Sequence, residues 1–204
     1  NLNMSNSILR TIEQLTPAEK AYALNRVRNE FEWNSNLKDK IERRMFEEIE
    51  KTGISDDLLH FVAFERYSFV EGCNYNGETP ILLKAMISAV DEYQKEELVR
   101  LVYGDDEDKI KNVKTEYIHY ISISIYGETV SARMEYYNKK DAFPSKDLDA
   151  EQLQNDIEVY FSATFSAMEA VLTLYSISLR SDENVERWIS MMGGVFDKNL
   201  RLVS

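Results

Sequence analysis

The stretch "KTEYIHYISISIYGETVSARMEYY", residues 114–137, decides the fold class because it fits either a helix or a β-hairpin. Read as a helix with its preceding residues, it has one face that is formed by Ile110, Val113, Tyr117, Ile121 and Ser124. On such a helix, Glu116 and His119 lie three positions apart and project to one side. The helical interpretation therefore brings a candidate metal-binding pair with it.

Read as a hairpin, the same stretch turns at Gly127-Glu128, with glycine at the first central position of a two-residue turn. The residues then face each other as Ile125–Val130, Ile123–Ala132, Ile121–Met134, Ser124–Ser131 and Ser122–Arg133. Both faces sort by polarity, as cross-strand pairs in a sheet do. Because the neighbouring segments have helical patterns and no third strand is evident, we favour the helix and keep a hairpin over residues 117–137 as the alternative.

Helix signals surround this stretch, and the chain has only 7 Gly and 3 Pro to interrupt them. Thr16-Pro17 followed by Glu19 is a capping box, and Gly53 is a stop signal after an apolar stripe with a four-residue spacing. Further helices are predicted over residues 56–72 with Ser55 as the cap, 80–103 with a stop at Gly104, 147–180, and from Ser181 or Asp182 onward. The predicted fold is all-α, a single domain over residues 1–204 with about seven to eight helices.

The charge balance limits the classes of partner. The 204 residues include 36 acidic and 24 basic side chains, a net charge of −12. Nucleic acids and anionic membranes require a basic face, so neither is an expected direct partner. A basic protein partner fits this acidity, and so does simple solubility. The chain has no signal-peptide pattern and no run of 18 uncharged apolar residues, and it contains one cysteine, Cys73. Together these features predict a cytoplasmic protein that does not span a membrane.

Residues 43–108 contain an aromatic-rich pattern followed by an apolar segment and an acidic turn. Leu58, Phe61 or Val62, Tyr67 and Val70 fit "L-x-x-F-x-x-x-x-Y-x-x-V", and residues 105–108 form the acidic turn. This pattern resembles the heme-oxygenase-like helical superfamily, in the branch with thiaminase II, the pyrroloquinoline-quinone synthesis oxidase and the non-heme di-iron oxygenases. The resemblance implies a metal-dependent oxidase or oxygenase that acts on a small, partly apolar molecule. The chain departs from these relatives because it has two histidines, and none after position 119.

The candidate metal ligands are two short pairs on the predicted helices. Glu116-x-x-His119 and Asp57-x-x-His60 each place a carboxylate and an imidazole on one helical side, and Glu65 or Glu71 completes the set. These ligand types suit iron, manganese or zinc alike, and the resemblance favours iron or manganese as the cofactor. Phe64, Tyr67 and Tyr120 are predicted to line a substrate pocket. If the hairpin forms instead, Glu116 and His119 fall on opposite faces and this pair no longer serves as a site.

Three functional hypotheses remain open at this stage. The first is the metal-dependent enzyme with a small-molecule substrate. The second is a non-catalytic acidic protein that binds a protein partner, as an inhibitor, an immunity protein or a nucleic-acid mimic does. The third is a ligand-binding scaffold without metal, and a homodimer is an open alternative for the assembly.

Overall fold

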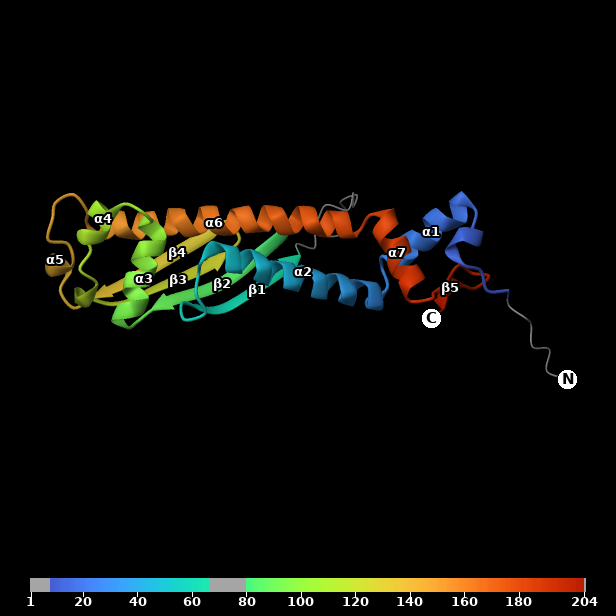
Figure 1. Cartoon of the computed structure of the whole chain (residues 1–204), viewed down its shortest axis with the longest axis horizontal. Coiled ribbons are helices and arrows are strands. Elements are labelled where there is room, and N and C mark those ends of the chain that lie inside the picture. The colour runs from blue at the N-terminus through green and yellow to red at the C-terminus, as the bar shows by residue number, and fades with distance from the viewer. Residues whose placement is uncertain (1–7, 67–79, 204) are drawn as a thin grey trace. The chain divides into compact units, whose positions relative to one another are not determined.

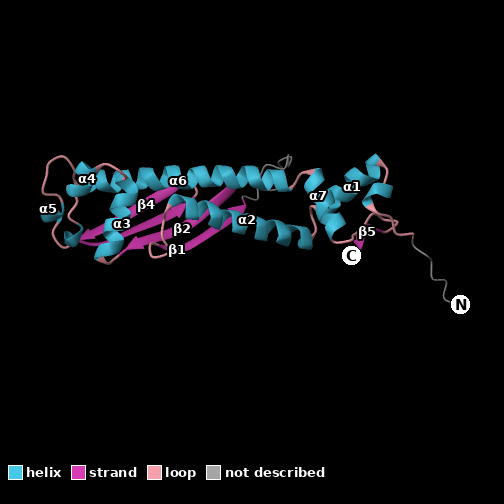
Figure 2. Ribbon diagram, viewed as in Figure 1, coloured by secondary structure: helices cyan, strands magenta, loops and turns pink. Residues whose placement is uncertain are grey.

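The protein combines helices with a β-sheet. A computed structural model describes residues 8–66 and 80–203. Within them, four strands form one antiparallel sheet and two short strands form a second (Figures 1 and 2). The prediction of an all-α helical bundle is therefore wrong, and the fold is mixed α/β.

Contacts between Cα atoms divide the chain into two compact units. Unit 1 comprises residues 1–41, 75–78 and 174–204, and unit 2 comprises residues 42–74 and 79–173. Helices α2 (Phe31–Thr52) and α6 (Ala150–Leu179) each contribute residues to both units.

The four-stranded sheet lies in unit 2 and is a simple meander. Its strands, in spatial as well as chain order, are β1 (Leu59–Arg66), β2 (Ile81–Ala89), β3 (Ile118–Tyr126) and β4 (Thr129–Tyr136). The helices predicted over residues 56–72, 80–103 and 109–137 are thus wrong where these strands lie. The decisive local signal is a period of two: "ILLKAMISA" in β2 alternates fully buried side chains with more exposed ones.

The hairpin alternative for residues 117–137 is confirmed, with the register read from the sequence. Ile125 pairs with Val130, Ile123 with Ala132, and Ser124 with Ser131. Gly127 has a φ of 56°, a conformation that side-chain-bearing residues rarely adopt, and this explains why the two-residue turn falls there. The helix prediction is wrong because β3 of this hairpin pairs with β2, and β2 in turn pairs with β1, which the sequence alone did not reveal.

One face of this sheet is buried in the core of unit 2. The inward residues of β2 and β3 are small or branched, and each is 3% exposed or less: Ile81, Leu83, Ala85, Ile87, Ala89, Ile118, Ile121, Ile123 and Ile125. Helix α6 contributes Phe161 and Phe165, both fully buried, to the core. Burial of each such side chain stabilises the fold by about 1.5–3 kcal/mol before entropy is subtracted.

Helix α6 also bonds to the backbone of the sheet. Strand β2 extends past the β3–β4 turn, so its first amides have no strand neighbour on that side. The N–H of Ile81 donates to Thr173 Oγ1 at 2.9 Å, and the N–H of Leu83 donates to Glu169 Oε1 at 2.9 Å. These two side chains satisfy amides that the ladder leaves open.

Helix α3 (Glu92–Tyr103) begins directly after β2. Asp91 accepts a hydrogen bond from the N–H of Gln94 at 2.8 Å, and the Gln94 side chain accepts one from the N–H of Asp91, which completes a capping box. The predicted stop at Gly104 is confirmed. The remaining short elements of unit 2 are α4 (Glu107–Lys111), the 3-10 turn η2 (Thr115–Tyr117) and α5 (Lys139–Ala142).

Unit 1 has its own core. Its elements are the 3-10 turn η1 (Ile12–Gln14), α1 (Pro17–Val27), α7 (Asp182–Met191), β5 (Val195–Phe196) and β6 (Leu202–Val203), together with parts of α2 and α6. Trp33 is 1% exposed and meets Trp188 edge-on, with ring centroids 5.4 Å apart. The predicted capping box of Thr16 and Glu19 is confirmed, and Ser181 caps α7.

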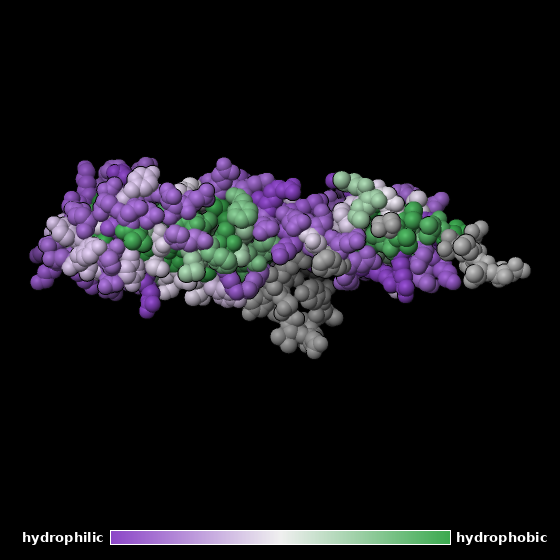
Figure 3. Space-filling model, turned by 90° about the horizontal axis from the view of Figure 1, so that it is seen from below, coloured by the Kyte–Doolittle hydropathy of each residue, from purple (hydrophilic) through white to green (hydrophobic). Residues whose placement is uncertain are grey.

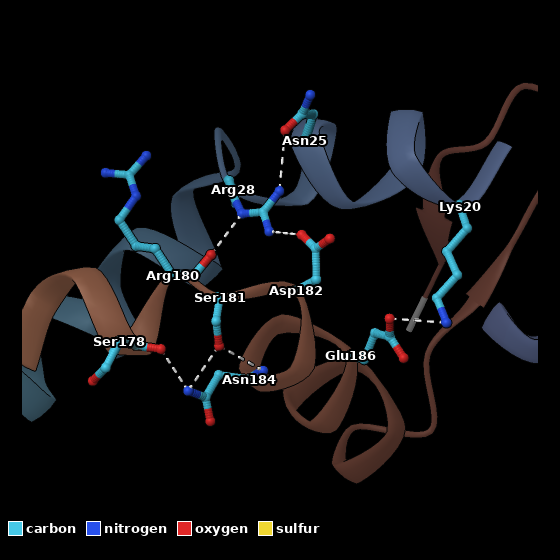
Figure 4. A network of polar contacts seen from close by, with 9 residues as sticks. All are labelled: Lys20, Asn25, Arg28, Ser178, Arg180, Ser181, Asp182, Asn184 and Glu186. Carbon is cyan, nitrogen blue, oxygen red and sulfur yellow. Dashed lines mark hydrogen bonds and ion pairs between the residues drawn. The ribbon is translucent and has the colours of Figure 1, made fainter. Parts of the chain in front are cut away.

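Polar contacts join α1 to the start of α7 within unit 1 (Figure 4). Arg28 donates to the backbone oxygen of Arg180 at 2.9 Å and forms an ion pair with Asp182. Lys20 lies 2.8 Å from Glu186 in a second ion pair. The Arg28 contacts satisfy a carbonyl at the end of α6, where helical hydrogen bonds run out.

Helix α6 is the one helix in residues 8–66 and 80–203 that is long and apolar enough to cross a membrane by length and composition. The core helix of a soluble protein passes the same test. In unit 2, α6 buries Phe161 and Phe165 and bonds to the sheet through Glu169. These contacts place one face of α6 in the core of unit 2 and are consistent with a soluble protein.

Candidate functional site

The two histidines predicted as metal ligands lie on different strands of the sheet. His60 on β1 is exposed, and its Nε2 lies 2.5 Å from Ser88 Oγ. His119 on β3 is exposed, and its Nδ1 lies 2.6 Å from the Tyr137 hydroxyl. Strand β2 separates β1 from β3 in the sheet, and each imidazole already has a hydroxyl partner.

The carboxylates predicted to join them are also dispersed. Glu116 lies in η2 and Asp57 in the turn before β1, both exposed. Glu65 on β1 pairs with Lys84 of β2. Glu71 lies outside the described residues. No group of three His, Cys, Asp or Glu side chains that could hold an ion occurs in the described parts of the chain. The metal site stays a prediction, but the two helices on which its pairs were based do not form: Asp57 and Glu116 lie in turns, and the two histidines lie on strands.

The predicted substrate pocket is divided in the same way. Phe64 is half-buried on β1, and Tyr120 is half-buried on β3, with β2 between their strands. Tyr67 lies outside the described residues. The two described members of the set are therefore not neighbours in the sheet.

The sheet brings a different set of side chains together on the face opposite the buried isoleucines. Phe61 pairs with Met86, Met86 with Ser124, and Ser124 with Ser131, so these four side chains project from one face. Phe61 is 49% exposed and Met86 is 55% exposed. We call this surface the open face; it comprises Phe61, Lys84, Met86, Ser88, Ser122, Ser124, Tyr126, Ser131 and Arg133.

An ion pair and an aromatic ring order one part of the open face. Lys84 binds the Glu65 carboxylate, and its Nζ lies 4.8 Å from the centre of the Tyr126 ring. The Tyr126 hydroxyl donates to Glu65 at 3.3 Å. The hydrogen bond from Lys84 lowers the pKa of the Glu65 carboxyl, and the same contact raises the pKa of Lys84. Both groups stay charged at neutral pH and cancel each other locally.

The net charge of the protein is confined to unit 2. The chain has 36 acidic and 24 basic residues, and unit 1 contains ten of each. Unit 2 therefore contains 26 acidic and 14 basic residues and carries the whole net charge of −12, whereas unit 1 is neutral. Such asymmetry gives unit 2 a field that attracts cationic surfaces.

Sequence reasoning missed the open face because it treated β1 and β2 as helices. The signal was available in "ILLKAMISA", where Lys84, Met86 and Ser88 alternate with buried apolar residues. Phe61 had been placed in a helical motif, although Val62 and Phe64 nearby favour a strand equally well.

No protein-family model, no curated protein and no solved structure matches the chain. Function is therefore inferred from the charges and contacts of the described residues.

Proposed function

We propose that the protein is a non-catalytic binding protein whose unit 2 docks on a basic protein partner. The observation that carries this proposal is the confinement of the net charge of −12 to unit 2, while unit 1 holds equal numbers of acidic and basic residues. A surplus of carboxylates on one unit steers a cationic partner toward it and disfavours acidic competitors.

The open face supports a protein rather than a small molecule as the partner. It presents Phe61, Met86 and Tyr126, each about half exposed, and the serines of the open face project from the same side of the sheet. Aromatic residues and methionine are enriched at the cores of protein interfaces, where they lose water to the partner. A sheet face from which such side chains project suits a broad contact with a protein, whereas small-molecule sites are typically concave.

Zero-length cross-linking of carboxylates to amines in a cell extract tests this proposal. The full chain is cross-linked at low ionic strength, and the linked peptides are identified by mass spectrometry. We expect the recovered proteins to be basic, with their lysines joined to carboxylates of unit 2. Links that gather on unit 1, or partners with a net negative charge, would overturn the proposal.

We also propose a cytoplasmic location, which follows from the single cysteine and the core contacts of α6. Fractionation of cells that express the full chain checks this. Recovery in the membrane pellet after a high-salt wash would contradict it.

A further inference from the structure

The two edges of the four-stranded sheet are treated differently. At the outer edge of β4, the N–H of Ala132 donates to Glu158 at 3.0 Å, and the C=O of Ala132 accepts from Gln154 at 3.1 Å. Both partners come from α6, so this helix occupies the outward hydrogen-bonding groups of Ala132, in the middle of that edge. A further strand beside β4 would have to displace these two contacts, and natural proteins protect sheet edges by such coverage.

The direction of the β2 backbone groups shows which side of β1 is free. The C=O of Leu83 accepts from Gly127, and the N–H groups of Leu83 and Ile81 bond to α6, so these residues point away from β1. Backbone groups alternate in direction along a strand. The backbone N–H and C=O groups of Lys84 and Met86 therefore point toward β1.

On β1 itself, Ala63 and Phe61 are the partners of Lys84 and Met86 and bond inward to β2. The N–H and C=O groups of Val62 and Phe64 consequently point outward. In the described parts of the chain, no backbone group pairs with this outer side of β1. Each of these two residues offers one donor and one acceptor to a further strand.

The core of unit 2 is also less complete along β1. Leu83 and Ala85 are 0% and 2% exposed, whereas their cross-strand partners Phe64 and Val62 are only half-buried. Figure 3, which views the molecule from below, shows hydrophobic side chains gathered in the region where Figure 1 places β1 and α2. A fifth strand beside β1 would remove water from Val62 and Phe64.

We propose that an extended basic segment of the partner adds to β1 as a fifth, edge strand. This inference rests on the proposed function and specifies how the partner docks. Main-chain hydrogen bonds to Val62 and Phe64 would supply affinity, and alternate apolar side chains of the segment would cover the exposed core. The remaining side chains of the segment would be lysine or arginine, which complement the net charge of −12 on unit 2.

The same charge disfavours a second copy of this chain as the occupant. Pairing of β1 with β1 would bring two units of net charge −12 together, and Glu65 lies within the paired strand. Like charges across an interface cost free energy unless they are compensated. A cationic segment carries no such cost.

Two synthetic peptides test the strand addition on the full chain. One is a nine-residue peptide of alternating lysine and valine, and the other has proline in place of each valine, with equal charge. Backbone amide exchange is followed by NMR, and affinity by titration. We expect the lysine–valine peptide to slow exchange at Val62 and Phe64 at least tenfold, and the proline peptide to bind at least tenfold more weakly, because it cannot form the ladder.

Two protein variants complete the test. Val62→Pro removes an outward N–H that is not part of the β1–β2 ladder, and Val62→Thr keeps that N–H at nearly equal volume. We expect Val62→Pro to weaken the lysine–valine peptide at least tenfold, and Val62→Thr to weaken it less than threefold. Thermal unfolding shows whether each variant is folded. If Val62→Pro does not fold, the effect of the peptide on amide exchange in the unaltered chain decides whether a fifth strand forms.

The outcomes separate this inference from the proposed function. Equal affinity for both peptides, unchanged exchange at Val62 and Phe64, or no binding of either peptide overturns the fifth strand. Protection of the same amides without peptide, rising with protein concentration, identifies a second copy and also overturns it. The proposed function fails separately, if the natural partner is not basic or links to unit 1.

Discussion

Glu169 on α6 accepts a hydrogen bond from the backbone N–H of Leu83 on β2 at 2.9 Å, although the glutamate is only 8% exposed. The contact joins the helix to the part of β2 that extends beyond the β3–β4 turn. Burial raises the pKa of the Glu169 carboxyl, while the hydrogen bond from Leu83 opposes that rise in part. The fold thus keeps a carboxylate in its core to satisfy one amide.

Replacement of Glu169 by glutamine is expected to stabilise the protein at neutral pH. The folded-state pKa lies above the unfolded value, so Glu169 favours the native state below its unfolded pKa and loses that contribution as the pH rises through the folded pKa. The glutamine side chain would keep an acceptor for Leu83 without ionising. Chemical denaturation at pH 4 and pH 7 checks this: the variant should gain stability relative to the parent at the higher pH.

Glu169→Leu supplies the control for that experiment. It removes the charge and also the acceptor, which leaves the Leu83 amide without a partner. An unsatisfied buried amide costs about 1–3 kcal/mol. Equal stability of the glutamine and leucine variants would show that the hydrogen bond contributes nothing.

Lys95 is expected to be a stability residue of unit 2. It is 4% exposed, its Nζ donates to the Ile118 carbonyl at 2.7 Å, and it lies 3.4 Å from Glu92. Lys95→Met leaves that carbonyl unpaired and the carboxylate unbalanced, at a cost of about 1–3 kcal/mol in the free energy of unfolding. Lys111→Met, at an exposed position, should change it by less than about 0.5 kcal/mol.

Gly127 is expected to tolerate no side chain without loss of stability. Its φ is 56°, and an added Cβ would lie 3.3 Å from a methyl group of Leu82. Gly127→Ala should destabilise by about 1–2 kcal/mol, because a left-handed conformation is strained for alanine. Glu128→Ala, at the other central position of the turn, is the matched control, and a similar loss in both variants would contradict the explanation.

Trp33 is expected to be central to unit 1. It is 1% exposed and packs edge-on against Trp188. Trp33→Ala should cost about 3–5 kcal/mol through the cavity it leaves. The chain has two tryptophans, so the remaining Trp188 fluorescence reports the change in this core directly during denaturation.

Local signals in the sequence predicted several elements of this fold and failed at others for a definable reason. Caps and stops at Thr16, Ser181, Gly53 and Gly104 were read correctly, because they depend on residues a few positions apart. The register of the 117–137 hairpin was also legible, since its pairs are local. The choice between hairpin and helix could not be made from these local pairs, because it depends on β2, which is about 30 residues distant in the chain.

The candidate site shows the same limit. The helical interpretation of β1 and β3 assigned His60 and His119 to carboxylate pairs on helical faces, whereas the sheet gives each of them a hydroxyl partner. The acidity was visible from composition. The confinement of the net charge to unit 2 was not visible, because each unit combines segments that are far apart in the sequence.

The central claim is tested most directly by the salt dependence of partner affinity in two charge-reversed proteins. One carries Glu96→Lys and Asp105→Lys in unit 2, and the matched control carries Glu32→Lys and Asp39→Lys in unit 1; all four positions are exposed. With the partner recovered by cross-linking, we expect affinity to fall as salt rises, to drop at least tenfold in the unit 2 variant at low salt, and to change less than threefold in the control. Equal losses in both variants, or an affinity that salt does not change, would contradict the account.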